Sequence, residues 1–149
     1  MDIITNLEQL RKPSQGLTQV ATVAATLRHE LMIRPDACGL AAVQIGRPAR
    51  IIAVRFRNAS GLRNPVVVMI EPRISRMDDE VIESVEGCLS LPDKLYKVKR
   101  HIALTVKFVD GVTGIPWTKH LAGIDAITVQ HEIDHLNGIL ICDKGEELP

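Results

Sequence analysis

The feature of this sequence that most restricts its fold is a pair of histidines, His131 and His135, four residues apart. The surrounding residues 124–136 contain no glycine or proline, carry Asp125 near their start, and are followed by Gly138. An acidic first turn and a glycine just past the end are typical of an α-helix. Side chains four apart project from one face of a helix and can bind one ion. The sequence therefore predicts a late helix that carries two metal ligands.

Glu132 directly follows the first of these histidines. In that position a carboxylate can lie beside a metal-bound water and act as a general base. Two other interpretations remain open from the pattern alone. The histidines could form a polar patch on a packed helix, or they could belong to a structural site, which usually has four protein ligands. The third ligand separates these cases.

The candidates for a third ligand downstream of the helix are poor. The extended metalloprotease pattern needs a histidine where this chain has Ile141, and the glutamates that remain, Glu146 and Glu147, are close in sequence to the pair. Upstream, Cys88 follows Gly87, which lets the backbone approach closely, and a thiolate is a good ligand for zinc or ferrous iron. A lone cysteine is more often a small buried apolar residue, but the histidine pair favours Cys88 as the third ligand.

An earlier amphipathic helix is predicted over residues 17–33, where apolar residues recur at helical spacing before Pro35 and Gly39. β-branched or alternating apolar runs between the two helices predict strands. The expected strands cover residues 50–57, 66–70, 73–77, 80–84, 94–101 and 102–109. Hairpin turns are expected at Asp78 with Asp79 and at Asp110 with Gly111. No repeat or linker interrupts the pattern, so we expect a single α+β domain over residues 1–149.

Composition excludes some classes of partner. Lys plus Arg and Asp plus Glu each total 18, and aromatic residues make up 3%, so neither global charge nor a stacking surface favours sequence-specific nucleic-acid binding. No window approaches the roughly 18 apolar residues of a membrane helix, and the first residues do not resemble an export signal. Three cysteines without a disulfide-scaffold spacing favour a reducing, cytoplasmic compartment.

Three segments in order resemble the motifs of the peptide deformylase family. They are CGLAAVQIG at 38–46, EGCLSLP at 86–92 and QHEIDHLNG at 130–138, and the resemblance extends from about Leu7 to Cys142. It implies a fold in which antiparallel β-sheets surround the metal-binding helix. It also implies a cytoplasmic metal-dependent hydrolase that removes the formyl group from the N-terminal formylmethionine of new polypeptides and releases formate.

The resemblance also implies residue roles. It makes Cys88, His131 and His135 the metal ligands and Glu132 the acid and base. The implied oxyanion donors are Gln44 and the backbone N–H of Leu89, and the expected substrate contacts are Gly39, Cys38, Leu89 and Ile127. Glu86 and Arg100 could form a supporting ion pair, but two surface charges fit the sequence equally well.

The implied cofactor is one divalent ion, usually Fe²⁺ in the cell, with Zn²⁺, Ni²⁺ or Co²⁺ able to occupy the same ligands. The implied partners are formylmethionyl peptides and nascent chains. About seven residues follow Cys142, so the ribosome-docking C-terminal helix of many family members is not expected. The rival interpretations are a metallopeptidase or amidase with another substrate, and a non-catalytic metal-binding protein.

Overall fold

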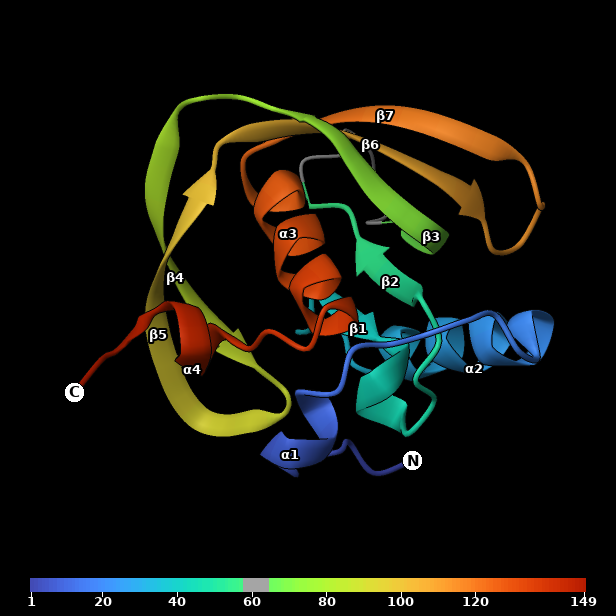
Figure 1. The fold of residues 1–149 in the computed structure, drawn as a ribbon, viewed down its shortest axis with the longest axis horizontal. Helices are drawn as coiled ribbons and strands as arrows, with labels where there is room; N and C mark the ends of the chain where they lie inside the picture. Colours follow the sequence, from blue (N-terminus) through green and yellow to red (C-terminus); the bar gives the residue numbers. More distant parts are fainter. Residues whose placement is uncertain (58–64) are drawn as a thin grey trace.

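The structure is a computed structural model that describes residues 1–57 and 65–149. Its elements, in chain order (Figure 1), are α1 (Leu7–Leu10), α2 (Val20–Met32), β1 (Gly39–Ala41), the 3-10 helix η1 (Ala42–Ile45), β2 (Ile51–Arg55), β3 (Val66–Met77), β4 (Val81–Cys88), β5 (Leu91–His101), β6 (Ala103–Asp110), β7 (Pro116–Ala122), α3 (Ile124–Leu136), α4 (Ile141–Lys144) and β8 (Glu146–Glu147).

The strands form two antiparallel sheets around α3. One sheet has five strands in the order β1-β2-β3-β6-β7, and the other has three in the order β4-β5-β8. Helix α3 contacts β1 and β2 of the first sheet and β5 of the second, so it lies between the sheets (Figure 1). The α+β class with antiparallel sheets around a late helix is confirmed.

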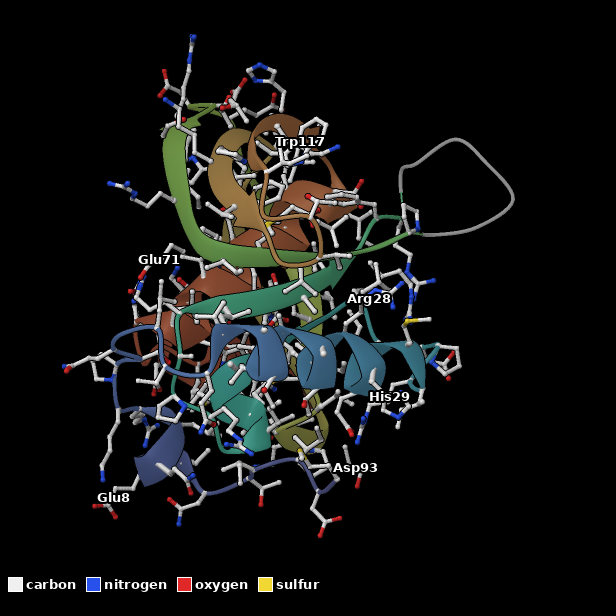
Figure 2. The ribbon with its side chains drawn as sticks, turned by 90° about the vertical axis from the view of Figure 1, so that its right-hand side faces the viewer. Glu8, Arg28, His29, Glu71, Asp93 and Trp117 are labelled. Atoms are coloured by element: carbon white, nitrogen blue, oxygen red, sulfur yellow. The ribbon has the colours of Figure 1, made fainter. Side chains whose placement is uncertain are left out.

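Two apolar cores lie on opposite faces of β2. Ile52 and Val54 pack in the core that contains α3, whereas Ile51 and Ala53 pack in the core that contains α2. Alternate residues of a strand point to opposite faces, and a strand covered on both faces is apolar along its length. The arrangement fixes α3 against the five-stranded sheet, and with it the two histidines. On the outer side of α2, Arg28 and His29 project into solvent (Figure 2).

Several predicted elements are confirmed. Helix α3 spans the predicted residues, and β6 and β7 form the hairpin expected after residue 109. In that turn, Oδ1 of Asp110 accepts hydrogen bonds from the amides of Val112 and Thr113. Helix α2 begins three residues later than expected, because Gln19 adopts a left-handed conformation with φ 53°.

The predicted hairpin around Asp78 and Asp79 is wrong. The residues before the turn belong to β3 in the five-stranded sheet, and the residues after it belong to β4, which pairs with β5 in the other sheet. Strand β3 is also continuous through Pro72, which had indicated a boundary. A bulge between Ile70 and Arg73 explains this continuity, because a bulge accommodates a proline that cannot donate a ladder hydrogen bond.

The last elements pack against the three-stranded sheet. Strand β8 pairs with β5 through Tyr96 and Lys97, and α4 also contacts β5. Among residues 1–57 and 65–149, no helix is long and apolar enough to cross a membrane.

Candidate metal centre

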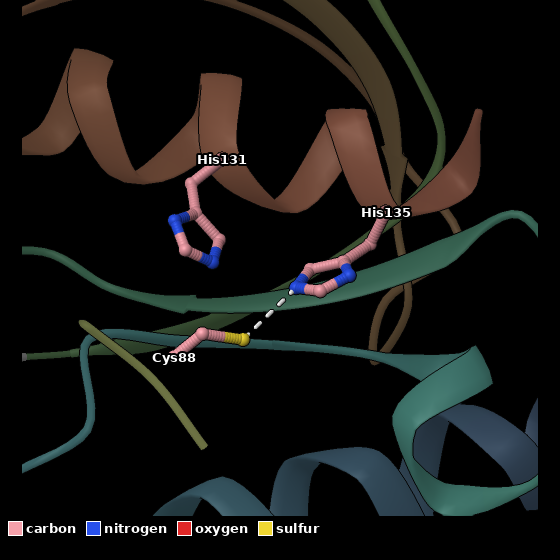
Figure 3. A group of neighbouring side chains, drawn as sticks. All are labelled: Cys88, His131 and His135. Atoms are coloured by element: carbon pink, nitrogen blue, oxygen red, sulfur yellow. Dashed lines mark hydrogen bonds between the residues drawn. The ribbon is translucent and has the colours of Figure 1, made fainter. Parts of the chain in front are cut away.

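The structure brings the three expected metal ligands together. Cys88 is the last residue of β4, and His131 and His135 lie one turn apart on α3 (Figure 3). One ligand atom from each of the three residues lies within 4.8 Å of the other two, and Sγ of Cys88 lies 3.4 Å from Nε2 of His135. Among the described residues, these three side chains are the group of His, Cys, Asp or Glu whose ligand atoms lie close enough together to hold one metal ion.

The spacing and chemistry of these donors fit a divalent ion. Tetrahedral zinc binds thiolate sulfur at about 2.3 Å and imidazole nitrogen at about 2.0–2.1 Å, which separates the two donors by about 3.5 Å. The observed sulfur to nitrogen distance is 3.4 Å. One thiolate and two imidazoles suit zinc and ferrous iron, and three protein ligands leave a coordination position for water or substrate.

A buried ion pair orients His131. Nδ1 of His131 donates to Oε1 of Glu86 at 2.8 Å, and Glu86 also accepts two hydrogen bonds from Arg100, each 2.8 Å long. Burial alone would raise the pKa of Glu86, but the bonds from Arg100 and His131 lower it to about 2. With Nδ1 engaged, Nε2 is left for the ion, which is the usual second-sphere arrangement of a metal-binding histidine.

The sequence left the pairing of Glu86 and Arg100 open, and the structure shows that it is a buried pair. Arg100 is 1% exposed and Glu86 is 8% exposed. Nη1 of Arg100 also donates to Asp134 at 2.6 Å, and Asp134 accepts a further bond from Lys144. Asp134 was not predicted from the sequence as a site residue. Its position between the two histidines was the available signal.

The two histidine rings have opposite electrostatic surroundings. Burial lowers the pKa of His131, but its contacts with Cys88 and Glu86 outweigh this and raise the pKa to about 10. Burial, assisted by the charges of His131 and Arg100, lowers the pKa of His135 to about 3. His135 is therefore neutral and keeps the lone pair with which an imidazole binds a metal ion.

Glu132 lies beside this group and is 4% exposed. Its Oε2 is buried and has no hydrogen-bond partner among the described residues, and burial raises its pKa to about 7. The backbone of Gly39 covers this side chain closely. A Cβ atom at Gly39 would lie 2.7 Å from Cγ and 2.8 Å from Oε1 of Glu132, so the glycine makes room for the carboxylate.

Gln44 lies in η1, the short helix that connects β1 and β2 of the five-stranded sheet. Its Oε1 accepts a hydrogen bond from the amide of Ala41 at 2.9 Å, which turns the NH2 group toward the centre. That NH2 group donates to Oγ of Ser90 at 3.1 Å and lies 3.6 Å from Sγ of Cys88. Ser90 was not identified from the sequence, although it lies in the same motif as Cys88.

A cavity of about 1090 Å³ opens onto the centre. The expected site residues that line it are Cys38, Gly39, Gln44, Cys88, Leu89, Ile127, His131 and Glu132. His135 is not among the lining residues and is 1% exposed, so it closes the centre from behind. The cavity is also lined by residues 34–37, which the sequence analysis did not connect with the site.

Comparison with known proteins agrees with this geometry. Residues 3–148 match the family described as polypeptide deformylase. A peptide deformylase from Agrobacterium fabrum is 38% identical over 142 residues, which cover 93% of this chain and 82% of the relative. The crystal structure of a probable peptide deformylase from Synechococcus phage S-SSM7 is similar with a TM-score of 0.85 and 33% identity, over 97% of this chain and 99% of that chain.

A class I type b peptide deformylase from Acinetobacter baumannii, solved with Met-Ala-Ser bound, has a TM-score of 0.83 and 28% identity, and the match covers 97% of each chain. The family match extends over all of the residues that build the two sheets and the centre. The chain therefore belongs to the polypeptide deformylase family of metal-dependent enzymes.

Proposed function

We propose that this chain hydrolyses the formyl group from the N-terminal formylmethionine of newly made polypeptides and releases formate. The observation that carries the proposal is the convergence of Cys88, His131 and His135 on one point at the cavity, with Glu132 beside it. Membership of the family and the Met-Ala-Ser complex of a relative support the choice of substrate. We further propose that residues 1–149 act as one catalytic domain in the cytoplasm.

Cys88, His131 and His135 would hold one divalent ion. We propose Fe²⁺ in the cell, with Zn²⁺, Ni²⁺ or Co²⁺ able to replace it, because a thiolate with two imidazoles suits all of these ions. When bound, the ion would supply Lewis acidity and lower the pKa of a water molecule toward about 7.

Glu132 would move the protons of the reaction. Its buried Oε2 has no protein partner in the described structure, so it is available to accept a proton from the attacking water. The same carboxyl group would then donate that proton to the nitrogen that leaves the formyl carbon. A carboxylate that neither binds the ion nor pairs with a cation is suited to both steps.

Gln44 and the backbone N–H of Leu89 would stabilise the oxygen that becomes negative as water attacks. The NH2 group of Gln44 already points toward Cys88, and Leu89 follows Cys88 directly along the cavity wall. One donor of this kind contributes about 2.7–4 kcal/mol to transition-state stabilisation in other hydrolases. The hydrogen bond from Ala41 keeps the Gln44 amide in the donating orientation.

The substrate would bind as an extended chain along β1. This strand lies at the end of the five-stranded sheet, so its outer edge can pair with a peptide through Gly39. Cys38, Leu89 and Ile127 would contact the methionine side chain. A cavity of about 1090 Å³ exceeds what one residue needs, so we expect it to accept several residues of the polypeptide.

The test is to purify the protein anaerobically with Fe²⁺ and to measure hydrolysis of three peptides: formyl-Met-Ala-Ser by release of formate, acetyl-Met-Ala-Ser by release of acetate, and the unblocked tripeptide by the appearance of new amino groups. We expect rapid release from the formylated peptide alone. The variant Glu132→Ala should retain its metal and lose formate release. Faster cleavage of the acetylated or unblocked peptide would instead identify an amidase or peptidase, and near-normal turnover by Glu132→Ala would contradict the assigned base.

A further inference from the structure

Arg55, at the end of β2, is a buried cation held by main-chain oxygens. The residue is 7% exposed, and no carboxylate of the described residues forms an ion pair with its guanidinium. The guanidinium instead donates to four carbonyl oxygens. These belong to Leu31 (2.9 Å), Arg34 (2.9 Å), Pro35 (3.1 Å) and Ala37 (2.5 Å).

The position of these oxygens explains how the charge is tolerated. Helix α2 ends at Met32, so the carbonyls of Leu31 and Arg34 lie in its last turn and just past it, where the helix dipole is negative. Each of these carbonyls also accepts a backbone hydrogen bond, from the amides of Arg34 and Ala37 respectively. Burial, together with the charge of Arg57, lowers the pKa of Arg55, while Cys38 and Asp36 oppose that shift. The four carbonyls are therefore the main compensation for the buried charge.

The same segment forms a wall of the cavity. Residues 34–39 line it without interruption. Arg55 holds this segment twice, because its side chain binds three carbonyls between residues 34 and 37 and its amide donates to the carbonyl of Cys38 at 2.7 Å. The next residue, Gly39, is fixed separately by pairing with Val54 in β2.

We propose that Arg55 is a positioning residue for the substrate: by binding the carbonyls of residues 31–37, it fixes the cavity wall against which the formylated peptide lies. The inference rests on the proposed function. Arg55 acts through the wall and does not reach the reacting atoms. Gly39 and Glu132 are held by strand pairing and by α3, so loss of the guanidinium displaces the wall and leaves the chemical machinery in place.

This division predicts which kinetic constant changes. An interaction that binds substrate and transition state equally affects KM and not kcat. For Arg55→Met we expect KM for formyl-Met-Ala-Ser to rise by about 10-fold or more with kcat within about twofold of the original enzyme. Arg55→Lys keeps the charge but not the planar set of five donors, so its KM should lie between the two. Arg73→Met, which removes an exposed arginine from β3, is the matched control and should change neither constant.

A second measurement reports whether the cavity wall has moved, and it needs no substrate. Cys38 lies in the same wall, directly after the last residue that the Arg55 guanidinium binds, and is partly buried. The rate at which a thiol reagent labels Cys38, followed on its own peptide by mass spectrometry, should rise in Arg55→Met and not in Arg73→Met. Thermal melting establishes that each variant is folded, and Arg55→Lys decides the question if Arg55→Met does not fold.

The outcomes separate this inference from the proposed function. If the original enzyme releases no formate, the proposed function fails, while the labelling of Cys38 still reports whether Arg55 holds the wall. If the original enzyme is active and a folded Arg55 variant keeps both the original KM and the original labelling rate, the positioning role is wrong. A fall in kcat at unchanged KM would also overturn it, because that result places Arg55 in the chemical step.

Discussion

Oε1 of Glu86 lies 2.8 Å from Nδ1 of His131, and this contact decides which nitrogen of the ring faces Cys88. The carboxylate is itself fixed by Arg100, which is buried and contacts Asp134 on the same helix as His131. His131 on α3 is thus oriented by Glu86 from β4 and Arg100 from β5. The geometry of the metal ligands therefore depends on how the three-stranded sheet packs against the helix.

Replacing Glu86 should weaken metal binding without removing a ligand. We expect Glu86→Gln to lower the affinity for Zn²⁺ by roughly 10- to 100-fold, because the neutral amide holds the ring less firmly and makes the ligand less basic. A chelator-competition titration measures the change. Glu83→Gln, on the exposed side of the same strand, is the control and should bind as the original protein does. Equal affinities for the two variants would show that Glu86 does not orient the ligand.

Metal binding should stabilise the fold through Cys88. At a free Zn²⁺ concentration 100 times the dissociation constant, we expect the free energy of unfolding to rise by about 2.7 kcal/mol. Urea denaturation with and without the ion measures this gain. Cys88→Ala should lose most of it, whereas Cys142→Ala, which replaces another free cysteine of the chain, should retain it. A full gain in Cys88→Ala would exclude the sulfur from the site.

Adding one methyl group at Gly39 should impair catalysis while leaving the metal bound. The new Cβ would lie 2.7 Å from Cγ of Glu132, too close for both groups to keep their positions. We expect Gly39→Ala to lower kcat by roughly 10- to 100-fold, because displacement of a catalytic group by about 1 Å costs a factor of this size. Metal content and melting temperature should stay near those of the original protein. An unchanged kcat would mean that Glu132 can move without consequence.

The ion pair between Glu30 and Arg34 should make stability depend on pH in acid. Nη1 of Arg34 donates to Oε2 of Glu30 at 2.7 Å, and this hydrogen bond lowers the pKa of Glu30 below its ordinary value of 4.5. A folded pKa below the unfolded one means that the ionised group stabilises the fold above the unfolded value. That contribution disappears as the pH falls through the folded value.

We therefore expect Glu30→Gln to cost about 1 kcal/mol of unfolding free energy at pH 7, with the difference from the original protein shrinking toward zero as the pH falls below the lowered pKa of Glu30. Urea denaturation at several pH values gives the difference directly, and Glu8→Gln, at an exposed position of α1, serves as the control. A difference that does not change with pH would show that the carboxylate charge is not the cause.

Local signals predicted the elements that carry the histidines and the clearest strands. Helix α3 agrees with its prediction at both ends, because Gly123 precedes it and Gly138 follows it with φ 73°. Strand β6 agrees because its buried residues alternate. Asp78 and Asp79 mark the end of β3, but the hairpin predicted there is wrong, because aspartates in a turn do not determine which strand the chain joins next.

Long-range packing explains what the sequence left open. The sequence does not distinguish a buried Arg100 from the solvated lysines that alternate with it along β5; contact with α3 and Glu86 makes the difference. The sequence also did not predict that Arg55 is buried against residues 31–37, because its partners are main-chain oxygens, which any sequence provides. The ligand set was predicted from the spacing of the two histidines and from a cysteine next to Gly87, and the resemblance of three motifs to one family implied the same residues. The position of Cys88 depends on a sheet that local patterns do not specify.

Because β4 belongs to one sheet and α3 packs on the other, an ion shared by Cys88, His131 and His135 would fasten the two halves of the fold together. It would close the chain between residues 88 and 131 into a loop, as a covalent cross-link does, and so restrict the freedom of the unfolded chain. Withdrawal of the ion would remove this link and leave β4 joined to α3 through the hydrogen bond of Glu86 with His131. The metal would contribute to the cohesion of the domain as well as to its chemistry.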